Sequence, residues 1–164
     1  MSPPRCLLLM RHARPLPPGQ GPDLARELSV EGWAQARRVG ESLRGQNAPG
    51  LIFSSPATRC LQTAHGVRDG LAAATASGAN AASPEILVRP ALGFDDPSVD
   101  LNELESAGAS VLIVSHHPTL VGLGAALLGR GAKPVDLRPG QLAILRGAPG
   151  AWVLEGLLDS SLRR

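Results

Sequence analysis

Arginine and histidine side chains directly follow three of the strongly apolar runs in this chain. Arg11 and His12 come after the first run, Arg59 lies just beyond the second, and His116 and His117 follow the fourth. Histidine can act as a nucleophile or as an acid–base catalyst near neutral pH, and arginine presents a planar fork of donors that matches phosphoryl oxygens. If the fold brings these residues together, their types predict a site that binds and transfers a phosphoryl group.

The apolar runs themselves predict the strands of a sheet. Four of them are short and continuous, which is typical of strands that are buried on both faces. Two more runs near the end of the chain are joined by a glycine-rich turn at residues 147–150, so they should pair antiparallel. The expected strands cover residues 6–10, 51–53, 85–88, 111–114, 142–145 and 152–154.

Helical patterns separate these strands and carry recognisable ends. Ser29 suits the N-cap of a helix that runs to about residue 44, with Trp33 on its buried face. Ser55-Pro56 and Asp96-Pro97 each combine a capping residue with a proline for the first turn of a helix. Gly129 should end the helix that follows the fourth strand.

Strands alternating with helices predict an α/β fold, a three-layer sandwich with a mostly parallel central sheet and helices on both faces. We expect residues 1–164 to form one domain. In open parallel sheets, ligands bind beyond the carboxyl ends of the strands, where helix N-termini also favour anions. Arg11, His12, Arg59 and His116 should therefore gather at one rim of the sheet.

Composition argues against several other classes of protein. The net charge of +2 over 164 residues is too small to predict nucleic-acid binding. The chain contains no apolar run of membrane-spanning length and no signal-peptide pattern, so we expect a cytoplasmic protein without membrane contact. Cys6 and Cys60 are not arranged as a CxxC pair and are expected to be buried packing residues. Composition gives no basis for an oligomeric state.

Four segments resemble the histidine phosphatase superfamily, also called phosphoglycerate-mutase-like. They occur in the family's order, and three of them lie at strand ends. The short chain is most similar to the SixA-like phosphohistidine phosphatase branch, which lacks the large inserted cap of longer members. The segments are Leu-Leu-Met-Arg-His-Ala at 8–13, Glu-Leu-Ser-Val-Glu-Gly at 27–32, Phe-Ser-Ser-Pro-Ala-Thr-Arg-Cys-Leu-Gln-Thr-Ala at 53–64, and Val-Leu-Ile-Val-Ser-His-His-Pro at 111–118.

The resemblance implies a role for each site residue. His12 would attack phosphorus and become phosphorylated, and water would then hydrolyse the phosphohistidine without a cofactor or metal. Arg11 and Arg59 would bind the phosphoryl oxygens and, as neighbouring cations, keep His12 deprotonated. His116 would donate to the phosphoryl group and stabilise charge in the transition state.

The general acid is less well marked. Longer relatives place a carboxylic acid after the third strand, where this chain has Ala91. Asp96 is explained by helix capping, which leaves Asp95 as the candidate acid. Pro18 stands where mutase members carry an asparagine, so mutase activity on phosphoglycerate is not expected.

Three functions remain open at this point. The first is hydrolysis of phosphohistidine on a protein, which suits a short chain with an open, shallow pocket. The second is hydrolysis of a small phosphomonoester, such as a sugar, nucleotide or cofactor-precursor phosphate. The loops at residues 14–22 and 70–84 would then have to close over the substrate. The third is a non-catalytic phosphate-binding module, which the presence of all four core residues argues against.

Other polar residues near the motifs have simpler interpretations. His117 occupies the middle place of a His-x-Pro motif and is expected at the rim or in solvent, and His65 on the exposed side of its helix. Arg14 is expected to be a solvated loop residue, with a place at the pocket mouth as the alternative. A metal site built from His116, His117 and residues 95–96 is disfavoured, because adjacent residues rarely ligate one metal ion.

Overall fold

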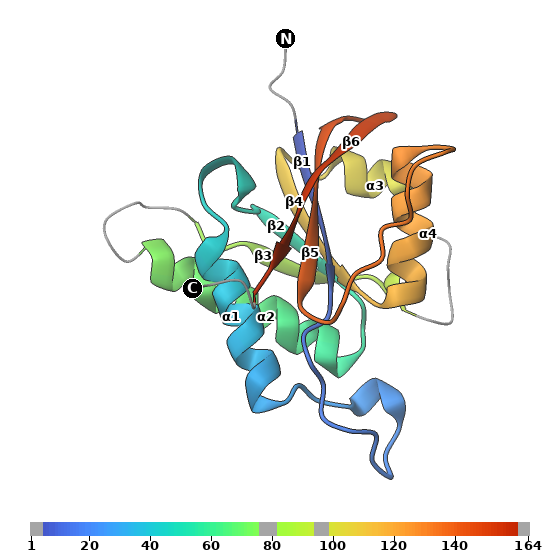
Figure 1. The fold of residues 1–164 in the computed structure, drawn as a ribbon. Coiled ribbons are helices and arrows are strands. Elements are labelled where there is room, and N and C mark those ends of the chain that lie inside the picture. Colours follow the sequence, from blue (N-terminus) through green and yellow to red (C-terminus); the bar gives the residue numbers. More distant parts are fainter. Residues whose placement is uncertain (1–4, 76–81, 94–98, 161–164) are drawn as a thin grey trace.

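A six-stranded sheet runs through the computed structural model of the protein, which describes residues 5–75, 82–93 and 99–160 (Figure 1). The strand order is β3-β2-β4-β1-β5-β6; β1 to β4 are parallel, β5 pairs antiparallel with β1, and β6 pairs antiparallel with β5. The predicted α/β class and mostly parallel sheet are confirmed. The strands are β1 Arg5–Arg11, β2 Leu51–Ser54, β3 Glu85–Val88, β4 Ser110–Ser115, β5 Gln141–Ala148 and β6 Ala151–Asp159.

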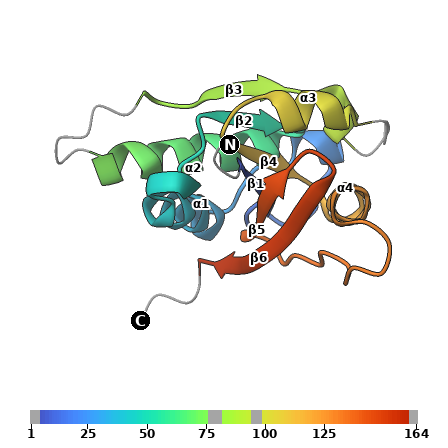
Figure 2. The ribbon, with the colours of Figure 1, turned by 90° about the horizontal axis from the view of Figure 1, so that it is seen from above.

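Helices cover both faces of this sheet, as the sequence predicts. Figure 2 shows α1 and α2 on one side of the sheet and α3 and α4 on the other. The helices are α1 Val30–Ser42, α2 Thr58–Thr75, α3 Leu101–Ser106 and α4 His117–Leu128, with short 3-10 turns η1 Asp23–Ala25, η2 Gly45–Asn47 and η3 Pro90–Leu92. No helix in these ranges is long and apolar enough to cross a membrane.

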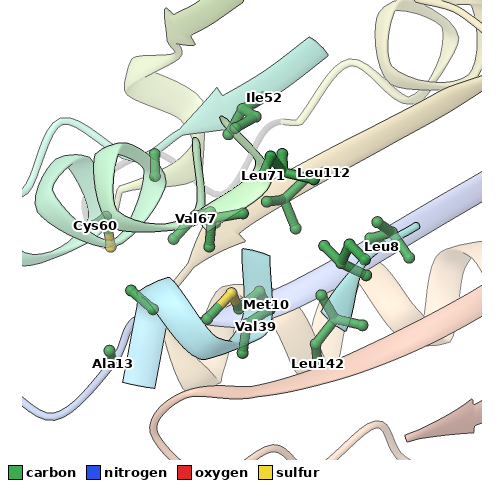
Figure 3. Close-up of a cluster of buried hydrophobic side chains, with 14 of the residues drawn as sticks. Leu8, Met10, Ala13, Val39, Ile52, Cys60, Val67, Leu71, Leu112 and Leu142 are labelled. Carbon is green, nitrogen blue, oxygen red and sulfur yellow. The ribbon is translucent and has the colours of Figure 1, made fainter. Parts of the chain in front are cut away.

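Alternation along the central strands divides the apolar side chains between two cores. Leu8 and Met10 of β1 face α1 and α2, where they pack with Val39 and Val67 (Figure 3). Leu7 and Leu9 point to the other face and join the apolar side of α4. Because successive residues of a strand point to opposite faces, a continuous apolar run is needed to fill both cores.

Helix ends follow the expected capping chemistry with one exception. The Ser29 hydroxyl accepts a hydrogen bond from the Gly32 amide at the start of α1, and Gly129 ends α4 with a positive φ of 81°. The exception is α3, which begins at Leu101 because the Asp100 carboxylate accepts from the Asn102 and Glu103 amides. The expected start at Asp96-Pro97 is therefore wrong for α3, and those two residues lie outside the described ranges.

The two helices on the first face approach each other unusually closely. A Cβ on Gly40 would lie 2.1 Å from the Val67 carbonyl oxygen, and a Cβ on Gly70 would lie 2.1 Å from that of Arg37. Glycine alone permits this contact between the two backbones. The prediction that Trp33 lies on the buried face of α1 is only partly correct. Its ring packs beside Gly66 at the surface rather than between the helices, and Trp33 remains 38% exposed.

Replacing Gly70 with alanine should therefore separate α1 from α2. We expect Gly70→Ala to lower the free energy of unfolding by about 1–3 kcal/mol, as overpacked substitutions do. Gly122→Ala is the matched control, because Gly122 is exposed on α4 and no atom would lie within 4 Å of the new Cβ. The control should be neutral or stabilising by up to about 1 kcal/mol. Urea denaturation measures both, and equal effects would contradict the close-contact explanation.

Candidate active site

The carboxyl ends of neighbouring strands bring the two motif histidines together. β1 and β4 are adjacent, with Arg11 opposite Ser115, and the His12 amide donates to the Ser115 carbonyl at 3.1 Å. The residues that follow these positions are His12 and His116, whose rings meet edge to face with centroids 5.6 Å apart. β2 lies on the other side of β4 and delivers Ser55 and the start of α2 to the same rim.

His12 is held as a neutral imidazole with one defined nitrogen carrying the lone pair. Its side chain is 5% exposed, and Nδ1 lies 2.9 Å from the Ala13 carbonyl oxygen. A carbonyl only accepts, so the ring proton is on Nδ1 and the lone pair is on Nε2. Burial lowers the pKa of His12 to about 4; the Ala13 hydrogen bond opposes this, and the positive charges of Arg59, Arg11 and Arg26 add to it.

Arg59 is the most deeply buried charge beside the histidines. It is the second residue of α2 and is 1% exposed. Nη1 donates to the Asp23 carbonyl at 2.8 Å, and Nη2 donates to Oδ2 of the Asp23 carboxylate at 3.0 Å. Nη2 also lies 3.3 Å from Nδ1 of His116. A buried charge is tolerated only when it is paired and hydrogen-bonded, and these contacts meet that requirement.

His116 is also neutral, with its proton on the opposite nitrogen to that of His12. A guanidinium only donates, so Nδ1 accepts from Arg59 and Nε2 carries the proton. Nε2 donates to the Ser55 hydroxyl at 2.8 Å. Burial lowers the pKa of His116 to about 3, and the charge of Arg59 contributes next. The buried Cys60 sulfur lies 3.7 Å from Nε2, and burial raises the pKa of this thiol to about 12, so it packs there as a neutral group.

Arg11 forms the wall of the site on the side of the segment between α4 and β5. Nη1 donates to the Leu137 carbonyl at 3.0 Å, and the Gly140 amide donates to the His12 carbonyl at 3.0 Å. Burial lowers the pKa of Arg11, while the charge of Asp136 acts in the opposite direction. Nε of Arg11 is buried and has no hydrogen-bond partner in the described part of the chain.

Side chains of the motif segments fix the backbone that follows His12. Thr63 accepts from the Ala13 amide at 3.0 Å and donates to the Arg59 carbonyl at 2.7 Å. The Gln35 side chain accepts from the Arg14 amide at 3.0 Å, and the Gln62 side chain accepts from the Leu28 amide at 2.7 Å. These residues therefore hold both ends of the segment 13–28 against α1 and α2.

Two charged residues at the site come from that segment and are absent from the sequence-based prediction. The Leu16 amide donates to the Glu27 carbonyl at 2.8 Å near the ends of this segment. The chain between these two residues therefore forms a closed loop. Asp23 and Arg26 project from this loop, form an ion pair of 3.1 Å, and line a cavity of about 300 Å³ inside it. The only indication of this ion pair in the sequence was an acidic residue and a basic residue three positions apart.

Outcomes differ for the remaining predicted residues. Asp95 lies outside the described residues, so its candidacy as the acid stays a prediction. His117 lies at the rim, where Nε2 is 2.7 Å from Oδ1 of Asp136. Arg14 is exposed and pairs with Glu31, and His65 is exposed beside Arg68. Within the described ranges, no group of three His, Cys, Asp or Glu side chains is placed to hold a metal ion.

The small-phosphomonoester hypothesis requires residues 70–84 to close over the substrate, but the described ends of this stretch lie away from the site. Gly70 lies in the last turns of α2, and Pro84 precedes β3 at the amino edge of the sheet, away from the histidines. A cavity of about 560 Å³ is found there, but none of the site residues lines it. Residues 76–81 are outside the described ranges.

Together these residues form a cationic cluster around two neutral histidines. Arg11, Arg26 and Arg59 surround His12 closely enough to lower its pKa. Guanidinium groups bind phosphoryl oxygens, and an imidazole with a lone pair on Nε2 is a nucleophile. The arrangement can therefore bind a phosphoryl group and attack its phosphorus atom.

Comparison with known families agrees with this geometry. Residues 7–78 match the sequence model of the histidine phosphatase superfamily (branch 1). This segment contains His12, Arg59 and the loop that carries Asp23 and Arg26. No curated protein matches the chain.

Solved structures share the fold over nearly the whole length. The protein histidine phosphatase SixA complexed with tungstate is 23% identical, with a TM-score of 0.74 over 95% of this chain and 97% of that one. A provisionally named phosphohistidine phosphatase SixA from Nakamurella multipartitia is 25% identical, with a TM-score of 0.69 over 96% and 98%. The ecdysone phosphate phosphatase from Bombix mori, complexed with tungstate, is 19% identical, with a TM-score of 0.67 over 93% and 92%.

The low pKa values of the two buried histidines can be measured directly. In ¹H–¹⁵N spectra of the ring nitrogens, we expect His12 to change protonation near pH 4 and His116 near pH 3, because burial and neighbouring cations disfavour the imidazolium. His12→Asn and His116→Asn assign the signals. Since both pKa values are depressed, both rings should stay neutral from pH 8 down to pH 5. Titration of either ring near pH 6.5 would contradict the electrostatic argument.

Proposed function

We propose that this chain, a phosphatase that belongs to the histidine phosphatase superfamily, works through a covalent phosphohistidine on His12 and acts on phosphohistidine in proteins. The observation that carries the catalytic part of the proposal is the state of His12. The ring is neutral, its lone pair is on Nε2, and three arginines are close enough to affect its charge. A nucleophile surrounded by donors for the group that it attacks suits phosphoryl transfer.

The first step transfers the phosphoryl group to the protein. Arg11, Arg59 and Arg26 bind the phosphoryl oxygens and neutralise their charge. The Nε2 lone pair of His12 attacks phosphorus, and the bond between phosphorus and the leaving atom breaks with its electron pair going to that atom. The Ala13 carbonyl accepts from Nδ1–H and stabilises the positive charge that develops on the ring.

His116 supports this step once its proton is on the nitrogen that faces the substrate. Nδ1 accepts from Arg59 in the absence of substrate. The Ser55 hydroxyl can accept from Nε2 or donate to it, so the other tautomer is available, with Nδ1–H donating to a phosphoryl oxygen. A bound phosphoryl dianion also favours protonation of His116. In both cases the ring supplies a hydrogen bond to charge that grows in the transition state.

The second step releases phosphate. Water attacks the phosphorus of phospho-His12, the bond between Nε2 and phosphorus breaks, and its electron pair returns to Nε2. The water proton goes to the phosphate or to a nearby base. We keep Asp95 as the candidate that protonates a poor leaving group in the first step. A phosphohistidine substrate leaves as an imidazole, which needs less help than an alkoxide.

The preference for a protein substrate rests on the shape of the site and on structural similarity. The 300 Å³ cavity beside the site is formed within residues 16–27, and neither His12 nor His116 lines it. This cavity therefore does not enclose the two histidines around a small phosphomonoester. The similar fold of the protein histidine phosphatase SixA supports the same choice. The ecdysone phosphate phosphatase has a comparable fold, so a small phosphate ester is the second candidate.

Turnover with and without the nucleophile tests this function. We expect purified protein to hydrolyse a phosphohistidine peptide faster than p-nitrophenyl phosphate, with chelator present. His12→Ala should lower turnover of both substrates by at least about 10³-fold, because the covalent route is lost. Quenched wild-type protein should carry an acid-labile phosphoryl group that His12→Ala lacks.

His65→Ala is the matched control, because His65 is an exposed histidine of α2 that contacts Arg68. It should retain wild-type turnover. Activity that survives in His12→Ala would exclude the proposed nucleophile. Faster hydrolysis of p-nitrophenyl phosphate and of sugar phosphates than of the peptide would favour the second candidate.

A further inference from the structure

We propose that Asp23 sets the specificity of this site by placing a carboxylate between two of the arginines that bind the phosphoryl group. This inference rests on the proposed function and adds to it. The negative charge would weaken the binding of free phosphate and of small phosphate esters. It would favour a phosphoryl group carried on a nitrogen base, whose leaving group can be positively charged.

The two carboxylate oxygens of Asp23 are shared between two guanidinium groups. Oδ2 accepts from Nη2 of Arg59 at 3.0 Å, and Oδ1 is 3.1 Å from Nη2 of Arg26. A phosphoryl group that approaches these two Nη2 donors has to share them with the carboxylate or displace it. Because the hydrogen bonds of a guanidinium to a carboxylate and to a phosphate use the same fork of donors, the two anions compete.

The side chain of Asp23 lies on the solvent side of this arrangement. It is 56% exposed, whereas the Arg59 side chain is 1% exposed. An incoming substrate therefore meets the carboxylate before it reaches the buried guanidinium. The charge also acts on the site itself, since it raises the pKa of His116 against the larger lowering effects of burial and of Arg59.

Arg59 does not depend on this carboxylate alone for its position. Its Nη1 donates to the main-chain carbonyl of Asp23 at 2.8 Å, and its Nη2 contacts His116. Neither contact requires the Asp23 side chain. A neutral residue at position 23 should therefore leave the Arg59 guanidinium in place while it removes the competing charge.

The ion pair with Asp23 does not use every hydrogen-bond donor of Arg26. Its Nε is buried and has no hydrogen-bond partner in the described ranges, and its charge lowers the pKa of His12. A donor of this kind costs free energy unless an acceptor arrives. A phosphoryl oxygen would be such an acceptor. This is consistent with a phosphoryl-binding position whose donors Asp23 only partly satisfies.

The chemistry of the leaving group explains why a carboxylate at this place would be selective. A phosphomonoester near neutral pH brings two negative charges and leaves through oxygen, so Asp23 repels it. A phosphohistidine also carries a negatively charged phosphoryl group, but its imidazole can take up a proton, and Asp23 attracts that positive charge. One charge can therefore lower the affinity for esters and spare a phosphohistidine.

Anion binding tests the proposal without relying on catalysis. We would titrate inorganic phosphate and tungstate into wild type and Asp23→Asn by calorimetry. Asp23→Asn should bind both anions about five-fold more tightly, as expected for the loss of one like charge at a partly exposed site. Glu27→Gln is the charge-matched control, because Glu27 is exposed on the same loop and contacts Gln62. It should bind with wild-type affinity, and Asp23→Glu should restore weak binding.

Steady-state kinetics supply the second readout. Asp23→Asn should lower the KM for p-nitrophenyl phosphate and raise its kcat/KM relative to that of a phosphohistidine peptide, by about three-fold or more. Unchanged or weaker anion binding in Asp23→Asn, with a normal melting temperature, would overturn the proposal and leave Asp23 as a structural partner of Arg59. An inactive wild type with tighter anion binding in Asp23→Asn would instead contradict the proposed function alone.

Discussion

The buried guanidinium of Arg59 is the interaction on which the site depends. At 1% exposure it would be prohibitively costly without partners, and its partners include Asp23 and His116, which are distant from it in the sequence. The guanidinium donates to the main-chain carbonyl and to the carboxylate of Asp23, and it contacts His116. The same charge disfavours protonation of both histidines. One side chain thus holds the loop at the site and contributes to keeping the proposed nucleophile neutral.

The sheet order explains why these partners can meet. β4 lies between β1 and β2, so the three strand ends that carry His12, His116 and Ser55 are neighbours although they are far apart in sequence. Side chains of α1 and α2 then fix the loop after β1 through its backbone amides. The close contact of these two helices through Gly40 and Gly70 brings the bonding groups within reach. The precision of the site therefore depends on backbone packing well below it.

The charges around the two histidines balance phosphoryl binding against phosphate release. Three arginines favour a phosphoryl group, but the same three would hold phosphate product tightly. Asp23 offsets part of that charge, and Asp136 lies near Arg11 on the opposite wall. A pocket with less positive charge releases product more readily, while the neutral histidines remain protected from protonation by burial, the largest cause of their low pKa values.

Much of the fold was predictable because each element has a local cause. Strands buried on both faces are continuous apolar runs, and caps such as Ser29 act within one turn of their helix. Predictions failed where a contact between elements decided the outcome. Trp33 fits an apolar helix face, yet its ring lies beside Gly66 of α2 and remains 38% exposed. The start predicted for α3 at Asp96-Pro97 is also wrong, because Asp100 caps this helix.

For the site, the sequence by itself determined which residue types follow the strands, and the parallel sheet placed His12, Arg11, Arg59 and His116 at one rim. Only the tertiary structure brought Asp23 and Arg26 to that rim, through a loop whose sequence is unremarkable. It also decided which nitrogen of each histidine carries the proton. Tautomers and pKa values depend on hydrogen-bond partners and burial, and those partners come from segments that are distant along the chain.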